Sequence, residues 1–378
     1  MPTEIDHSQT NTALRSFPGV LESREQGLVL LSPEGRTARR RVLFVNAYGG
    51  SCVWDQIKTG MLPGHHLWGC IELVQLGYEI LLTEPLPHFN FRRSPLPHDL
   101  RFLRLVNEWL GPDDILYSGH TLLYWLPLLK RANLLKCKVV SLMYAREKLD
   151  WAQAHCGIIA MTPAAEVTAR QLAPKAKVVR LPWGVDLNFF PRLPYEPDTF
   201  LSCGITNRDH ATLCAAAKIS TRPIRLICPS KPLGLDWPLN VDVVDSGRGW
   251  NFQKKQVGYD QLLTDFYARA TATIVVLKND PDETTANGFT NLLESMAMAR
   301  PVVFTRTGAV PGEIDVEGAG IGFYASPEDP ADLAEAIEDL ASDRARAHAM
   351  GDAGRQLCQS HYCISRYAEG LHHFFESL

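Results

Sequence analysis

The stretch GFTNLLESMAMARPVV, residues 288–303, contains a glycine turn, a short amphipathic helix and an apolar strand that a proline opens. The first backbone N–H groups of such a helix have no acceptor within the helix and lie at the positive end of its dipole. They form a site for a pyrophosphate, and Gly288 allows the phosphate oxygens to approach the backbone closely. Glu294, about one turn further on, can accept two hydrogen bonds from a ribose diol, as acidic residues do in dinucleotide-binding folds. The alternative is an ordinary helix–strand unit whose glutamate is exposed to solvent.

Outward from this stretch, apolar runs of strand length alternate with segments of helical spacing, such as 66–76 and 259–270. Runs that are almost wholly apolar indicate parallel sheets covered by helices on both faces. The predicted fold class is therefore α/β, with two Rossmann-like parallel-sheet domains that face each other across a cleft. Ligands of such sheets bind at the carboxyl ends of the strands, so the chemistry is expected in that cleft. The strands are expected at residues 42–47, 78–83, 114–118, 138–143, 157–161 and 177–181, and then at 200–203, 224–228, 241–244, 273–277, 301–304 and 321–324.

Prolines interrupt this alternation between the two halves, at Pro182, Pro191, Pro194 and Pro197. Proline lacks an N–H group and has a fixed φ, so the cluster indicates a linker between domains. The segment 361–378 is expected to form a C-terminal helix, which can pack back on the first domain. We predict a polar leader over 1–38 with one short strand at 27–31, a first domain over 39–183, a second domain over 184–360 and a C-terminal helix over 361–378.

The composition is that of a globular protein with two cores. The 378 residues are 46% hydrophobic and 21% charged, and the formal net charge of −4 excludes a global attraction to nucleic acid. Nine cysteines without a CxxC pair, a polar N-terminus and no long apolar run are typical of a cytoplasmic protein with free thiols. The basic run RTARRR at 36–41 is either a solvated strand edge or a weak contact with anionic lipid.

The stretch around Glu294 also resembles the signature of the retaining, nucleotide-sugar glycosyltransferases of family 4 (group 1), which have the GT-B fold. That signature consists of Glu-x-Phe-Gly, an apolar run and Glu-Ala-Met-Ala-x-Gly-x-Pro-Val, and this chain has LESMAMARPV at 293–302. Segment 42–50 resembles the family's first strand and glycine-rich loop, 113–120 its strand that ends in a histidine, and 183–190 its Asn-Gly-Val-Asp linker. The similarity covers residues 41–375.

The resemblance implies an enzyme that transfers a sugar, of the hexosyltransferase type, from a nucleotide-diphosphate donor to an acceptor with retention at the anomeric carbon. It implies an acceptor-binding N-terminal domain, a C-terminal domain that binds a UDP- or GDP-linked sugar, and no metal or separate cofactor. His120 would contact the transferred sugar, and closure of the domains about the linker would exclude water. The nucleotide and its phosphates would be held at Gly49, Gly50, Gly288, Phe289, Thr290 and Glu294.

Two positions depart from the family pattern. The acidic residue expected before Glu294 is Ala286, and the nearby Glu283 is the candidate replacement as a catalytic contact to the sugar hydroxyls. The arginine expected after the first strand of the second domain is Ile205, and Arg208 is the candidate for holding the phosphates, because a guanidinium binds them bidentately. These departures keep open the alternative of a catalytically inactive, nucleotide-binding subunit. A sugar-nucleotide epimerase on the same fold is a further alternative, although the sequence offers no paired acid/base carboxylates for it.

Three other motifs carry less weight. The DPD motif at 280–282 can hold a divalent ion against a diphosphate, but it precedes a helix that already serves the phosphates, so a polar loop is the preferred interpretation. The CQSHYC segment at 358–363 has no second pair of ligands, so no zinc site is expected. The histidine pair at 65–66 either packs a helix start or contacts the acceptor.

The acceptor class stays open among small molecules, glycans and lipid-linked molecules. Loops 51–60 and 85–97 are individual to this chain, and the second is either plain surface or a contact to acceptor or peripheral lipid. A homodimer is a further option.

Overall fold

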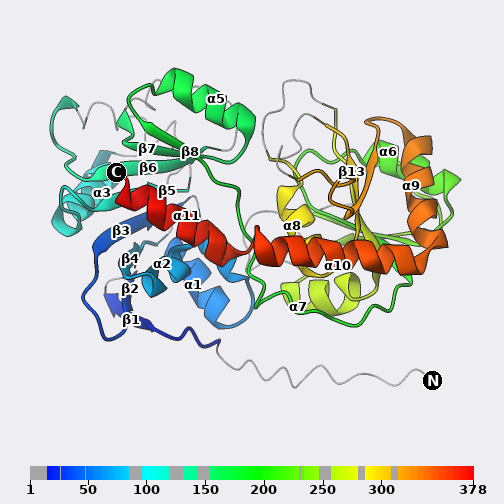
Figure 1. Ribbon diagram of the computed structural model, residues 1–378, viewed down its shortest axis with the longest axis horizontal. Coiled ribbons are helices and arrows are strands. Elements are labelled where there is room, and N and C mark those ends of the chain that lie inside the picture. The colour runs from blue at the N-terminus through cyan, green and yellow to red at the C-terminus, as the bar shows by residue number, and fades with distance from the viewer. Residues whose placement is uncertain are drawn as a thin grey trace.

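The structure is a computed structural model of the 378-residue chain. Two sheets with helices on both sides lie next to each other (Figure 1), so the predicted α/β class with two Rossmann-like domains is confirmed. In the part of the chain that is described, no helix combines the length and apolar character needed to cross a bilayer. The described residues are 15–25, 27–46, 48–84, 96–119, 129, 131–143, 154–229, 232, 234–246, 257–279, 286–307 and 314–378, with the side chains of 96–101 excepted.

The first sheet has eight strands in the order β1-β2-β4-β3-β5-β6-β7-β8. Neighbours from β4 to β8 are parallel, and the side chains of β5 and β7 are fully buried, as in a sheet covered on both faces. The strands are β1 (Val20–Glu25), β2 (Leu28–Pro33), β3 (Arg40–Val45), β4 (Tyr78–Leu82), β5 (Ile115–Ser118), β6 (Lys138–Met143), β7 (Gly157–Ala160) and β8 (Lys177–Arg180). The helices are α1 (Gly50–Lys58), η1 (Gly64–Leu67), α2 (Cys70–Gln75), α3 (Leu96–Trp109) and α5 (Pro163–Leu172).

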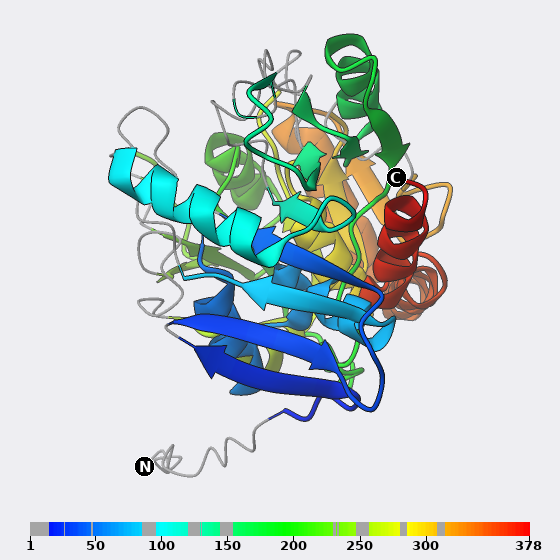
Figure 2. The ribbon, with the colours of Figure 1, turned by 90° about the vertical axis from the view of Figure 1, so that its left-hand side faces the viewer.

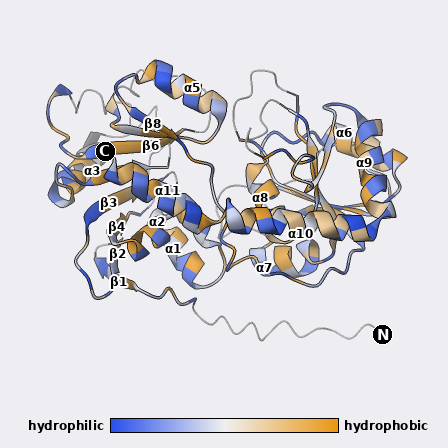
Figure 3. Cartoon of the chain, viewed as in Figure 1, coloured by the Kyte–Doolittle hydropathy of each residue, from blue (hydrophilic) through white to orange (hydrophobic). Residues whose placement is uncertain are grey.

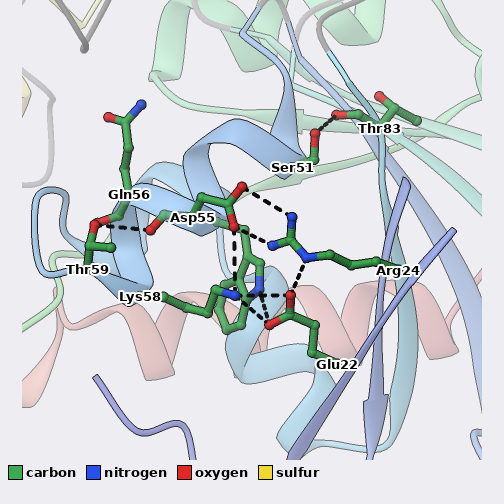
Figure 4. A network of polar contacts seen from close by, with 9 residues as sticks. Glu22, Arg24, Ser51, Asp55, Gln56, Lys58, Thr59 and Thr83 are labelled. Carbon is green, nitrogen blue, oxygen red and sulfur yellow. Dashed lines mark hydrogen bonds and ion pairs between the residues drawn. The ribbon is translucent and has the colours of Figure 1, made fainter. Parts of the chain in front are cut away.

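The antiparallel hairpin of β1 and β2 extends this sheet at one edge (Figure 2), in the segment where the sequence suggests a polar leader. All residues of β1 after the first are exposed, so its side chains carry no alternating apolar signal. Ion pairs and a hydrogen bond tie the hairpin to α1 (Figure 4). Glu22 accepts from Lys58 Nζ at 2.8 Å and from Trp54 Nε1 at 2.9 Å, and Arg24 pairs with Asp55. The hairpin therefore belongs to the first sheet.

The second sheet has six strands in the order β11-β10-β9-β12-β13-β14, and all of its pairs are parallel. The helix expected over 259–270 consists of α7 (Tyr259–Gln261) and the π-helical η4 (Leu262–Tyr267). It ends earlier than expected, because β12 begins at Ala270. The strands are β9 (Thr199–Cys203), β10 (Ile224–Cys228), β11 (Val241–Asp245), β12 (Ala270–Val275), β13 (Val302–Thr305) and β14 (Gly322–Ala325). The other helices are α6 (His210–Ile219), α8 (Phe289–Ala297), α9 (Pro330–Ser342), α10 (Arg344–Ser360) and α11 (Ile364–Glu376).

Both faces of the second sheet are covered. One core contains side chains of α6 and α9, and the other contains side chains of η4 and α8. Adjacent residues of β9 point to opposite cores: Phe200 joins the first and Leu201 the second. Figure 3 shows helices such as α9 with both hydrophobic and hydrophilic residues, as expected for helices that cover a sheet.

The chain crosses between the domains twice, in the linker after β8 and at the junction of α10 with α11 (Figure 1). The two crossings are bonded to each other. Val185 N–H donates to Tyr362 O at 2.8 Å, and Ile364 N–H donates to Val185 O at 2.9 Å. Gly184 lies directly against the second crossing, since a Cβ there would be 2.5 Å from the carbonyl carbon of Cys363. Beyond this junction, α11 packs on α2 of the first domain.

The helix expected over 66–76 is interrupted. Trp68 and Gly69, between η1 and α2, have left-handed φ angles of 51° and 79°. A Cβ on Gly69 would come within 3.1 Å of Leu371 in α11. The close approach of α11, together with the left-handed φ, explains why glycine occupies this position at the break.

Candidate functional site

The start of α8 lies in the loop region after β12, at the carboxyl edge of the sheet, where a ligand is expected. Gly288 caps the helix with a left-handed φ of 76°, and no side chain bonds the helix end. A Cβ on Gly288 would come within 2.7 Å of Val275, so the absence of a side chain at this position lets the start of α8 pack closely against the sheet. The side chain of Phe289 is buried in the core, and Thr290 is partly buried. The helix end thus keeps N–H donors that suit an anion.

Glu294 faces inward from α8 rather than toward solvent. Only 3% of the residue is exposed, and its carboxylate accepts hydrogen bonds from the Tyr259 hydroxyl at 2.8 Å and the Tyr267 hydroxyl at 3.3 Å. Burial, together with nearby acidic groups, raises the pKa of both phenols well above its ordinary value, so both stay donors at neutral pH. The two tyrosines use two of the roughly four acceptor positions of a carboxylate. The alternative of a solvent-exposed glutamate is therefore excluded.

Arg208 lies in the loop after β9 with only 8% of the residue exposed. Its guanidinium donates to Cys203 O at 3.3 Å, to Thr206 O at 2.7 Å and to Asn291 Oδ1 in the first turn of α8. Gly204 makes room for this arrangement, because its φ is 113° and a Cβ would come within 2.7 Å of Asn291 Oδ1. Burial lowers the pKa of Arg208, although a guanidinium stays charged in proteins. A fixed positive charge is thus held next to the start of α8.

Tyr259 also contacts the linker and the first domain. Its hydroxyl oxygen lies 3.3 Å from His66 Nε2 in η1. Its ring packs edge-on against Phe189 and Phe190, with centroid distances of 5.5 and 6.1 Å. One side chain therefore joins the carboxylate of Glu294 to the linker and to the N-terminal domain.

The glycines expected in the first domain lie at the start of α1. Gly49 caps this helix and Gly50 is its first residue, where a Cβ would come within 3.3 Å of Leu82.

His65 and His66, the histidine pair of η1, differ in environment. His65 Nδ1 accepts a hydrogen bond from Asp186 N–H at 3.2 Å, and burial, assisted by Arg15, lowers the pKa of His65 to about 3. His65 is thus a neutral packing residue of the hinge.

Several expected site residues lie outside the described residues. They are His120, Glu283, the DPD motif at 280–282 and most of the loop at 85–97. Their roles stay predictions.

Both departures from the family pattern lie within the described residues. Ala286 is partly buried and packs against the core, and Ile205 is 49% exposed.

In the described ranges, no group of three or more His, Cys, Asp or Glu side chains is arranged to hold a metal ion. Metal independence stays a prediction, because the DPD motif lies in a gap.

Sequence patterns do not single out Tyr259, Tyr267 and Asn291 as site residues. The tyrosines lie 35 and 27 positions before Glu294, so only the packing of the segment formed by α7 and η4 against α8 brings them together. Two hydroxylated aromatic residues on one helical segment are the sole signal in the sequence. π-Helical turns are often found at functional sites, but the sequence does not show that η4 is π-helical.

A pocket of about 500 Å³ lies beside the two crossings between the domains. It is lined by the linker, by α2 and by the segment around Arg15. Asp186, in its wall, accepts hydrogen bonds from Gly64 N–H at 2.7 Å and from Arg15 at 3.0 Å. None of the residues expected to hold the nucleotide lines this pocket, so we do not assign it to the donor.

A model of the family described as Glycosyl transferases group 1 matches residues 248–343, in the C-terminal domain. A comparison with curated proteins finds no match. Sucrose-phosphate synthase from Thermosynechococcus elongatus is a similar solved structure, with 15% identity, a TM-score of 0.63 and coverage of 90% of this chain and 99% of that chain. Anabaena HepE, solved with UDP and glucose, has 13% identity, a TM-score of 0.58 and coverage of 90% and 100%.

A trehalose-phosphate synthase (UDP-forming) from Burkholderia vietnamiensis is similar as well, with 13% identity, a TM-score of 0.59 and coverage of 91% and 100%. At such identities the solved structures show the fold alone, which is GT-B. The family match covers the segment that holds Tyr259, Glu294 and the start of α8. The match and the fold together identify the chain as a glycosyltransferase of the GT-B fold that resembles the group 1 glycosyltransferases.

Proposed function

We propose that the protein transfers a sugar from a UDP- or GDP-linked donor to an acceptor on its N-terminal domain, with retention and without a metal or other cofactor. The observation that carries the proposal is the start of α8, where Glu294 is held by two tyrosines and Arg208 is fixed alongside. The complex of HepE with UDP and glucose supports a nucleotide-sugar donor. The acceptor, a small molecule, glycan or lipid-linked molecule, stays open within this proposal, as do a cytoplasmic location and a homodimer.

Each part of the site has one task in the proposal. The diphosphate would bind the N–H groups at the start of α8, and Arg208 would stabilise the charge of the leaving group. Glu294 would accept hydrogen bonds from the ribose hydroxyls. His120 and Glu283 would contact the transferred sugar, since the position of the family's acidic residue is occupied by Ala286.

Nucleotide binding tests the proposal directly. Thermal-shift and calorimetric titrations with UDP, GDP, ADP and dTDP should show binding of one of them, because a ligand of the folded state raises its midpoint. Glu294→Ala should weaken that binding by about 1.5–3 kcal/mol, roughly 10- to 150-fold in Kd, since a hydrogen-bonded charge is removed. Glu369→Ala is the control, because Glu369 pairs only with exposed Arg366 among the described contacts. Equal affinities of wild type and Glu294→Ala would contradict the assignment.

A catalytically inactive, nucleotide-binding subunit is the second candidate. Ala286 and Ile205 favour it, because both stand where the family has charged residues. Incubation with a panel of UDP- and GDP-sugars separates the candidates. Release of free nucleotide supports an enzyme, whereas binding without release from any donor supports the inactive subunit.

A further inference from the structure

Tyr259 has an unusual position for a residue outside the family signature. It belongs to the short helix α7 of the second domain, yet its hydroxyl lies between a carboxylate of its own domain and a histidine of the other. The distances are 2.8 Å to Glu294 Oε1 and 3.3 Å to His66 Nε2. Packing against Phe189 and Phe190 holds the ring in place from the linker side.

The chemistry of the three groups sets the direction of these hydrogen bonds. The Tyr259 hydroxyl carries a single proton, which it donates to Glu294 Oε1. The phenolic oxygen can then only accept from His66, which must carry its proton on Nε2. The order is thus His66 N–H to Tyr259 O, and Tyr259 O–H to Glu294. Hydrogen bonds that end on a charge are the stronger ones, and each member of such a chain polarises the next.

We propose that Tyr259 is the positioning residue of Glu294 and sets the preference of the site for ribose over 2′-deoxyribose, and that His66 supports it from the N-terminal domain. The inference rests on the proposed function, because it requires that Glu294 binds the ribose diol.

The hydrogen bonds to the Glu294 carboxylate favour a positioning role over simple packing. Tyr259 bonds one carboxylate oxygen and Tyr267 the other, so the plane of the Glu294 carboxylate is fixed at both ends. A diol is recognised by two parallel hydrogen bonds, which need a carboxylate in one orientation. If the bond to Oε1 is removed, the carboxylate can rotate about its last torsion, which has broad minima. The bond to the 2′-hydroxyl then loses its geometry.

Tyr259→Phe removes only the hydroxyl and keeps the ring packing. Calorimetry with UDP, GDP and ADP, each beside its 2′-deoxy counterpart, measures the effect on both affinity and sugar preference. We expect Tyr259→Phe to weaken binding of the preferred ribonucleotide about 3- to 10-fold, the worth of one positioned hydrogen bond. Binding of its 2′-deoxy counterpart should change much less, so the ribo-to-deoxyribo ratio should fall by a similar factor. His66→Leu should act in the same direction with a smaller effect.

Tyr195→Phe is the matched control. It removes a phenol hydroxyl that donates to Thr271 O at 3.1 Å, away from Glu294. This control should leave the ribo-to-deoxyribo ratio unchanged. A general loosening of the fold would lower the affinity for both sugars equally and would not change the ratio.

A double-mutant cycle makes the test specific. In a Glu294→Ala background, Tyr259→Phe should have no further effect on the affinity, because its partner is absent. Additive effects of the two substitutions, or an unchanged ribo-to-deoxyribo ratio in Tyr259→Phe, would overturn the inference while the proposed function stands. Failure of every nucleotide to bind the wild type, or an inert Glu294→Ala, would overturn both.

Discussion

Gly184→Ala should disturb the hinge, because the two crossings between the domains touch at this residue. The new Cβ would lie 2.5 Å from the carbonyl carbon of Cys363 and 2.8 Å from Ile364 N. Both neighbours are backbone atoms, so no side-chain rotation can relieve the contact. Either the linker or the junction of α10 with α11 must move.

Two contributions set the size of the effect. Overpacking of this kind costs about 1–3 kcal/mol. The shift also strains the two backbone hydrogen bonds that Val185 makes with Tyr362 and Ile364, at 2.8 and 2.9 Å. Each contributes about 0.5–1.5 kcal/mol. The free energy of unfolding should therefore fall by about 2–6 kcal/mol. With an unfolding entropy of about 2.1 cal/mol/K per residue, this lowers the Tm of the 378-residue chain by about 3–8 °C.

Thermal and urea unfolding of the whole chain provide the assay, with Gly111→Ala as control. Gly111 lies in a loop, and a Cβ there would meet only Asp114 at an ordinary 3.4 Å. Gly111→Ala should change stability by less than about 1 kcal/mol. If Gly184→Ala were as stable as this control, the bonded crossings would not be what holds the domains together.

Glu22→Gln should destabilise the hairpin at pH 7 by up to about 1 kcal/mol, the range of a partly exposed ion pair. Partial burial opposes ionisation of Glu22, but hydrogen bonds from Lys58, Trp54 and Arg24 outweigh it and hold its pKa below the ordinary 4.5. The carboxylate's contribution is therefore present above that value and is lost as the pH falls through the lower folded-state pKa. Urea titrations at pH 7 and at a series of acid pH values should show that the difference from wild type shrinks as the pH falls below 4.5 and disappears below the folded-state pKa. Sugar transfer should survive EDTA, because helix N–H groups and Arg208 serve the diphosphate; a loss that Mg²⁺ restores would assign a metal to the DPD motif at 280–282.

The fold was predictable because its central strands are apolar on both faces. Runs such as 157–161 and 301–304 stand out in the sequence since parallel sheets bury every residue. The hairpin of β1 and β2 lies at the edge of the first sheet, and β1 exposes its side chains to solvent. The sequence at 20–25 is therefore polar and, taken alone, is interpreted as part of a leader without a fold. The break at Gly69 was not predictable either, because the spacing of apolar residues continues through it, and the helix that packs against Gly69, α11, lies about 300 residues further along the chain.

The candidate site divides in the same way. A glycine before an amphipathic helix and a glutamate within it are local features, so Gly288 and Glu294 could be proposed from the sequence. The groups that orient them are not local. Tyr259 in α7 and Tyr267 in η4 reach Glu294 only through tertiary packing, and no periodicity encodes which hydroxyl meets which oxygen of the carboxylate.

Arg208 shows how the departure at Ile205 can be compensated within the same loop. A guanidinium has five N–H donors, and within the described part of the chain two backbone carbonyls and Asn291 accept three of them, so the proposed function would use the other two for a phosphate. An arginine already fixed by the protein loses little freedom when it binds, and it needs no reorganisation as charge develops on the leaving group. An arginine at position 205 would start from an exposed loop instead, since Ile205 is 49% exposed. Under the proposed function, the phosphates would therefore bind with a different geometry from that of the family, at Arg208 fixed by Asn291 and given room by Gly204.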